Sequence, residues 1–128
     1  MCIRDRTVLE ELVAIAPDHC PAWFPLGEAL RSLDEPSLAR EAFGRAIACD
    51  PNDARPRYNR AQLALAAGDV DEARADFEAL LDSKVEGDPR YAGLHLALAR
   101  LDRDAGNDAG AKAHYARYRE LGGTQPLD

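Results

Sequence analysis

Apolar residues in this chain recur at helical spacing, in segments of about 12–16 residues separated by Pro, Gly, Asp and Asn. No segment shows the sustained apolar and polar alternation of a half-buried strand. Asp69, Asp88 and Asp108 stand at helix starts, where aspartate can accept hydrogen bonds from unpaired N–H groups. The pattern predicts an all-α chain with helices over residues 4–16, 21–33, 36–49, 54–67, 70–83, 89–105 and 108–121.

The chain also repeats itself. Four pairs of like residues lie 34 positions apart: Pro17 and Pro51, Gly27 and Ala61, Ala39 and Ala73, and Phe43 and Phe77. A shift of 38 continues the pattern from Ala61 to Ala99, Gly68 to Gly106, Ala73 to Ala111 and Phe77 to Tyr115. The four extra residues fit an insertion around 83–87 or a longer following helix. Such a chain is expected to stack hairpins, because one hairpin cannot bury its apolar stripe alone.

One unit carries a recognisable signature. Its residues are Trp23, Leu26, Gly27 and Leu30, then Ala39, Phe43 and Ala46, and finally Pro51. This unit resembles the tetratricopeptide repeat, W-x₂-L-G-x₂-Y…A-x₃-F…P, with leucine in place of the first-helix tyrosine. The second unit keeps the small residues and Phe77, but has Arg57 and Arg60 in place of Trp23 and Leu26. The third keeps Leu98, Ala99, Gly106, Ala111 and Tyr115.

The resemblance implies a right-handed α-solenoid of antiparallel helix hairpins, with about seven helices. Residues 1–19 would be a half repeat, the second helix of a truncated unit. Residues 20–53, 54–87 and 88–123 would be three whole units, the second with a short insertion near its end. Residues 124–128 would be a short tail.

Composition narrows the function classes. The 16 basic and 23 acidic residues give a net charge of −7, and a pI near 4.9 argues against nucleic-acid binding. No apolar run approaches the roughly 18 residues of a membrane span, and the first residues lack a secretory signal. We therefore expect a cytoplasmic protein.

Three cysteines without C-x-x-C spacing do not predict a disulfide framework or a standard zinc site. An antiparallel hairpin would nevertheless bring Cys20 and Cys49 together, with His19 adjacent. They could form a redox pair or a weak metal site, or be small buried hydrophobes, which is the favoured interpretation; whether the two cysteines pair stays open. His95 and His114 are interpreted as isolated surface or packing residues.

Candidate catalytic groups are not apparent. The carboxylates of the fifth predicted helix are interpreted as a solvated face and not an acid–base pair: Asp71, Glu72, Asp76 and Glu78. We expect no enzyme activity, no cofactor and no bound metal.

The tetratricopeptide resemblance implies a protein–protein interaction scaffold whose first helices line a concave groove for a peptide or helix. By register, the groove residues are Phe24, Glu28, Arg31, Arg55, Tyr58, Asn59, Gln62, Leu65, Leu96, Arg100 and Arg103. Four arginines favour an acidic or carboxylate-bearing segment, unless these side chains are merely solvated.

The carboxylate clamp of chaperone-binding repeats fits poorly. Asn59 matches one clamp position, but Phe24 and Glu28 stand where the clamp has lysine and asparagine. Gly93 and Ala97 stand where it has basic residues.

The first predicted helix exposes Leu9, Leu12 and Val13, which would pack on a helix that this sequence does not contain. One hypothesis is a C-terminal fragment of a larger enzyme or secretion or assembly protein, in which the repeats recruit substrate or partner. The other is a complete small protein whose first helix is covered by self-association.

Overall fold

The computed structural model of the chain describes residues 10–11, 14 and 20–127. That part of the chain forms six α-helices and three short 3₁₀-helices and contains no strand, as predicted for an all-α fold. The α-helices are α2 (Trp23–Ser32), α3 (Pro36–Cys49), α4 (Ala54–Ala66), α5 (Val70–Leu81), α6 (Gly93–Asp104) and α7 (Asp108–Glu120). The 3₁₀-helices are η1 (Cys20–Ala22), η2 (Lys84–Gly87) and η3 (Pro89–Tyr91). The predicted helix 4–16, and with it most of the half repeat 1–19, lies outside the described residues.

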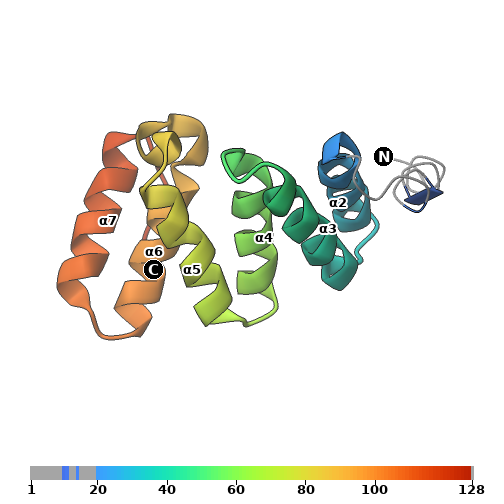
Figure 1. The fold of residues 1–128 in the computed structure, drawn as a ribbon. Coiled ribbons are helices and arrows are strands. Elements are labelled where there is room, and N and C mark those ends of the chain that lie inside the picture. Colours follow the sequence, from blue (N-terminus) through green and yellow to red (C-terminus); the bar gives the residue numbers. More distant parts are fainter. Residues whose placement is uncertain (1–9, 12–13, 15–19, 128) are drawn as a thin grey trace.

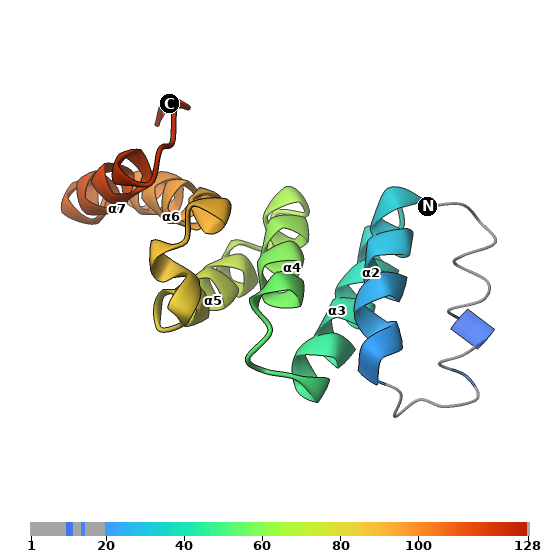
Figure 2. The ribbon, with the colours of Figure 1, turned by 90° about the horizontal axis from the view of Figure 1, so that it is seen from above.

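The helices form a stack of three hairpins, α2–α3, α4–α5 and α6–α7, in chain order (Figure 1). Between hairpins, α3 packs on α4 and α5 packs on α6. Figure 2 shows α2, α4 and α6 along one side of the stack and α3 and α5 along the other. We call the side formed by α2, α4 and α6 the groove face. Because each helix packs chiefly on its neighbours, the molecule is a solenoid and has no single central core.

The same turn closes each hairpin. Asp34, Gly68 and Gly106 have positive φ angles of 58°, 84° and 82° at the ends of α2, α4 and α6. In each turn, the next residue donates its N–H back to a carbonyl in the last helical turn, as in a Schellman motif. These bonds run from Glu35 N to Leu30 O (2.9 Å), Asp69 N to Ala64 O (2.9 Å) and Asn107 N to Asp102 O (2.8 Å). The turns follow the 34- and 38-residue spacing of the sequence.

The longer spacing before the third unit is taken up by η2 and η3. For this reason α6 begins at Gly93 and not at the predicted residue 89. Asp88 caps η3, accepting a hydrogen bond from Arg90 N at 3.0 Å. The prediction that Asp108 caps the last helix is wrong, since Asn107 Oδ1 accepts from Gly110 N at 3.1 Å. Asp69 does stand at the start of α5, but its side chain makes no capping hydrogen bond there. It pairs with Arg40, whose Nη1 lies 2.7 Å from Oδ2.

Apolar packing occurs in three clusters along the stack. Phe43 lies at the centre of the first and Phe77 at the centre of the second, both fully buried. Gly27 makes room for Phe43, because a Cβ on Gly27 would lie 2.5 Å from Cε1 of that ring. In the third cluster Tyr118 is the buried aromatic (5% exposed), whereas the repeat-matched Tyr115 is only half-buried.

The predicted solvated face of α5 is wrong for Asp76. This carboxylate is 3% exposed and accepts hydrogen bonds from Arg60 Nε at 2.8 Å and Nη2 at 2.7 Å. Burial of a carboxylate is costly unless it is paired, and Arg60 supplies the charge. Asp71, Glu72 and Glu78 are exposed, as predicted.

Candidate functional site

A hollow of about 440 Å³ lies between α4 and α6 on the groove face. Six predicted groove residues line it: Tyr58, Gln62, Leu65, Leu96, Arg100 and Arg103. Gly93, Ala97, Leu101, Asp104 and Gln125 complete the lining. The repeat register therefore brought together the groove residues of the second unit, except Arg55 and Asn59, with those of the third.

Tyr58 forms a rigid wall of this hollow. Its ring packs edge-on against Phe77, at 6.1 Å between centroids, and against Tyr91, at 5.3 Å. Gly93 permits this position, since a Cβ there would collide with the Tyr58 hydroxyl. Burial raises the pKa of Tyr58, so the phenol remains neutral at physiological pH.

The predicted groove residues on α2 form a separate cluster with Arg55 and Asn59. The Arg55 guanidinium lies 4.5 Å from the Phe24 ring centroid and also binds Asp53, with Nη2 at 2.7 Å from Oδ2. Hydrogen bonding from Arg55 lowers the pKa of Asp53. Glu28 accepts hydrogen bonds from Asn59 Nδ2 at 2.5 Å and Arg31 Nη2 at 3.0 Å.

Two of the four groove arginines are therefore neutralised locally, Arg31 by Glu28 and Arg55 by Asp53. The other two, Arg100 and Arg103, project from α6 into the hollow. Arg103 also contacts Asp104, with Nη2 at 3.2 Å from Oδ1. Three of the four groove arginines thus have a carboxylate partner among the described residues, so the positive charge expected along the whole groove is largely paired, including at its α6 end.

Residues 124–127, which we call the tail segment, lie against this end. Arg100 donates from Nη2 to Pro126 O at 3.0 Å and from Nε to Leu127 O at 3.2 Å, and Arg103 Nη1 donates to Leu127 O at 2.7 Å. In Figure 2 the chain rises from α7 on the groove-face side. Sequence reasoning missed this contact, since the tail segment has no periodicity and its bonds use main-chain carbonyls that any residue supplies.

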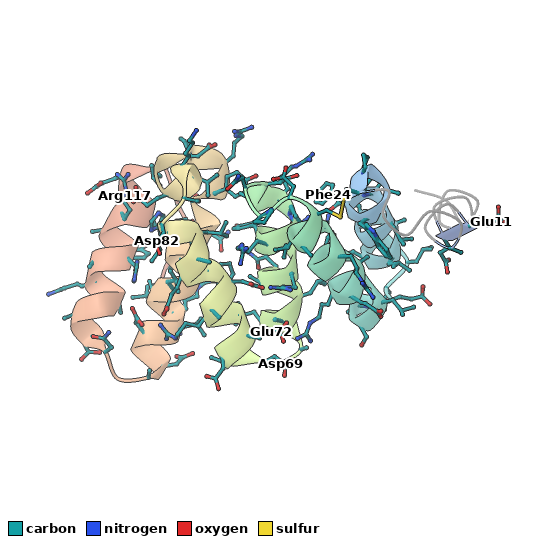
Figure 3. The ribbon with its side chains drawn as sticks, in the orientation of Figure 1. Glu11, Phe24, Asp69, Glu72, Asp82 and Arg117 are labelled. Carbon is teal, nitrogen blue, oxygen red and sulfur yellow. A yellow bond between two sulfur atoms is a disulfide. The ribbon has the colours of Figure 1, made fainter. Side chains whose placement is uncertain are left out.

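Cys20 and Cys49 form a disulfide that joins η1 to the end of α3, with Cα atoms 5.5 Å apart (Figure 3). Both residues are exposed, so the favoured interpretation as small buried hydrophobes is wrong. The antiparallel hairpin did bring the two cysteines together. Among the described residues, no group of three His, Cys, Asp or Glu side chains is arranged to hold a metal ion.

The two predicted isolated histidines lie close to each other, with ring centroids 6.2 Å apart. His95 is 2% exposed, and its Nε2 lies 2.7 Å from Glu86 O. Burial lowers the pKa of His114, partly opposed by Asp102, whose Oδ2 lies 3.7 Å from Nε2. Both act as packing residues in the structure.

Comparisons with known proteins agree with this fold. The family model described as "Tetratricopeptide repeat" matches residues 42–75. The chain is 34% identical over 108 residues to the tetratricopeptide repeat and J domain-containing co-chaperone DNJ1 of Fusarium oxysporum f. sp. lycopersici. That match covers 80% of this chain, which spans only 20% of the co-chaperone.

Solved structures of MamA have the same arrangement of helices. A MamA crystal structure matches 91% of this chain and 66% of its own, with a TM-score of 0.79 and 22% identity. A MamA structure from Desulfovibrio magneticus RS-1 gives a TM-score of 0.74 at 21% identity, covering 91% of this chain and 63% of its own. Among the described residues, no helix is long and apolar enough to cross a bilayer. From its repeated hairpins and these matches, the chain belongs to the tetratricopeptide repeat family.

Proposed function

We propose that this chain is a protein–protein interaction scaffold whose groove face binds an extended segment of a partner protein, without catalysis of its own. The observation that carries the proposal is the pair Arg100 and Arg103, which donate to the successive main-chain carbonyls of Pro126 and Leu127. The same donors could hold the backbone of a partner. Tetratricopeptide repeat proteins are generally scaffolds of this kind.

The chemistry of the hollow defines the partner segment. Charged guanidinium donors make stronger hydrogen bonds to carbonyls than neutral donors, and they fix the direction of the bound backbone. Leu65, Leu96 and Ala97 provide an apolar lining for one partner side chain. An acidic partner residue is favoured beside Arg100 and disfavoured near α2, where Glu28 already takes the hydrogen bonds of Asn59 and Arg31.

A chaperone-tail ligand is not part of this proposal, although the fungal relative is named a co-chaperone. The Asn59 amide that matches the clamp donates to Glu28, so a carboxylate ligand would meet a negative charge there. Since this chain spans 20% of that relative, the alternative hypothesis is that the same face recruits a partner or substrate for a larger enzyme or secretion or assembly protein.

The disulfide between Cys20 and Cys49 bears on the compartment in which this protein resides. Disulfides form and persist in oxidising compartments and are rare in the cytosol. The expected cytoplasmic location therefore stays a prediction, tested by trapping free thiols with an alkylating reagent in intact cells and measuring the state of Cys20 and Cys49. Reduced thiols would support the cytoplasm and a disulfide would contradict it.

Selection of peptides from a displayed library on the full chain tests the binding proposal. We expect Arg100→Ala and Arg103→Ala each to weaken a selected peptide about tenfold or more, with the unfolding midpoint nearly unchanged. Arg90→Ala is the matched control, because this guanidinium is 82% exposed and lies outside the hollow. Tyr58→Ala is unsuitable, since Tyr58 supports Phe77. Equal affinities in the native chain and both variants would reject the groove assignment.

A further inference from the structure

We infer that the tail segment is an intramolecular ligand of the α4–α6 hollow, and that a partner binds by displacing it. This inference rests on the proposed function, since it names what regulates access to the same site. The tail segment accepts hydrogen bonds from Arg100 and Arg103, the same donors that the proposed function assigns to a partner backbone.

Two helices hold the tail segment, and both use its backbone. From α6, the two arginines donate to the carbonyls of Pro126 and Leu127. From α7, Tyr115 OH donates to Gln125 O at 2.9 Å, and Gln125 N donates to Tyr118 OH at 3.0 Å. Three consecutive residues thus have main-chain groups bonded to protein side chains, as the backbone of a bound peptide would.

The tail segment also forms part of the wall of the hollow. Gln125 is one of the residues that line the hollow, and Leu127 is partly buried. A partner carbonyl cannot accept from Arg103 Nη1 along the same direction while Leu127 O does so. A partner that takes over these same hydrogen bonds must therefore displace the tail segment from them.

Its attachment makes the tail segment an effective competitor. Gly122 ends α7 at a φ of 94°, and two residues then lead directly to Gln125. A ligand joined by so short a connection has an effective concentration in the millimolar range. Even a few backbone hydrogen bonds then suffice to keep the site occupied, while a partner with more contacts displaces the tail.

Occupancy is measured in the full chain by ¹⁵N relaxation of the amides of residues 124, 125 and 127. We expect ordered amides in the native chain and fast motion of the Leu127 amide in the double variant Arg100→Ala/Arg103→Ala, with Arg90→Ala unchanged as the control; Tyr115 and Tyr118 still hold Gln125 in this variant. A Leu127 amide that is already mobile in the native chain, or that stays ordered in the double variant, would overturn the inference.

Competition is measured with a synthetic peptide of residues 122–128, amidated so that its end adds no carboxylate. The released chain carries Tyr115→Phe, Gln125→Gly, Pro126→Gly and Leu127→Gly, which loosen the tail and leave the α4 and α6 lining intact. Followed by chemical shifts up to millimolar peptide, the released chain should bind at least tenfold more tightly than the native chain. Equal binding to both chains, or binding to neither, would overturn the inference.

These results separate the two proposals. A library-selected peptide that needs Arg100 and binds the native and released chains equally would leave the proposed function standing and remove the tail as competitor. A library that yields no groove-dependent peptide on either chain would reject the proposed function, while the relaxation data alone still report whether the tail occupies the hollow.

Discussion

Arg60 and Asp76 occupy repeat positions that are apolar in the first unit. The equivalent residues of the first unit, 34 positions earlier, are Leu26 and Ala42, which belong to one apolar cluster. The second unit replaces this apolar pair with an ion pair between α4 and α5. The poor match of Arg60 to the family pattern is thus compensated by a second change in the facing helix.

Asp76→Ala should destabilise the protein by about 3–5 kcal/mol, because Arg60 loses the charge that offsets its burial. The double variant Arg60→Leu/Asp76→Ala restores the pair found in the first unit and should recover most or all of this loss. Urea unfolding measures both. A double variant no more stable than Asp76→Ala would show that the ion pair is not an exchangeable substitute for apolar packing.

His114 should make stability fall with acidification. Burial holds its folded-state pKa below the unfolded value, so the unfolded chain binds a proton first as the pH drops through about 6.5. Asp102, His95, Arg74 and Glu78 surround the ring. The free energy of unfolding should decrease from pH 7.5 to pH 5.5, and His114→Gln should flatten this slope. An unchanged slope in the variant would contradict the assignment.

Register arithmetic located the residues of the hollow, because solenoid repeats place equivalent positions on one face. It located six of them, including Tyr58 and Arg100. The repeat spacing did not identify the burial of Asp76, because a carboxylate on a helix is predicted to be solvated unless its charged partner is known. Comparing Arg60 and Asp76 together with Leu26 and Ala42 would have given that signal.

At the scale of elements, helix boundaries were predictable where Pro, Gly or Asp breaks the pattern. The predicted and observed α3 coincide at residues 36–49. The predicted helix start at residue 89 was wrong because a 3₁₀ turn intervenes there. This turn, η3, has a proline at its first position, just as an α-helix often has. The closing turns repeat more faithfully than the helices, and Asp34 adopts the left-handed conformation that glycine provides in the other two hairpins.

The Cys20–Cys49 disulfide should stabilise the first hairpin. It closes a loop with a sequence separation of 29, for which restriction of the unfolded chain predicts roughly 3–4 kcal/mol. The variant Cys20→Ser/Cys49→Ser should lose about this much in thermal or urea unfolding, and a reductant should destabilise the native chain but not this variant. Cys2→Ser, which leaves both disulfide cysteines in place, is the control. A reductant without effect on the native chain would contradict a stabilising disulfide.

At the scale of the whole molecule, charged contacts join consecutive hairpins. Arg40 on α3 reaches Glu72 on α5, and Arg74 on α5 donates to Asp102 on α6 at 2.8 Å. Arg40 and Arg74 are 34 residues apart, so the same repeat position makes both links. The acidic residues behind the net charge of −7 are therefore not all on a solvated outer surface, since some of them pair with arginines of a neighbouring unit.

Binding of a partner segment to the groove face between α4 and α6 can be mapped by the chemical-shift changes that a library-selected peptide causes in the ¹⁵N-labelled full chain. We expect the largest changes on α4, α6 and the tail segment, around Tyr58, Leu96, Arg100 and Gln125. Changes confined to α3, α5 and the outer side of α7 would contradict it.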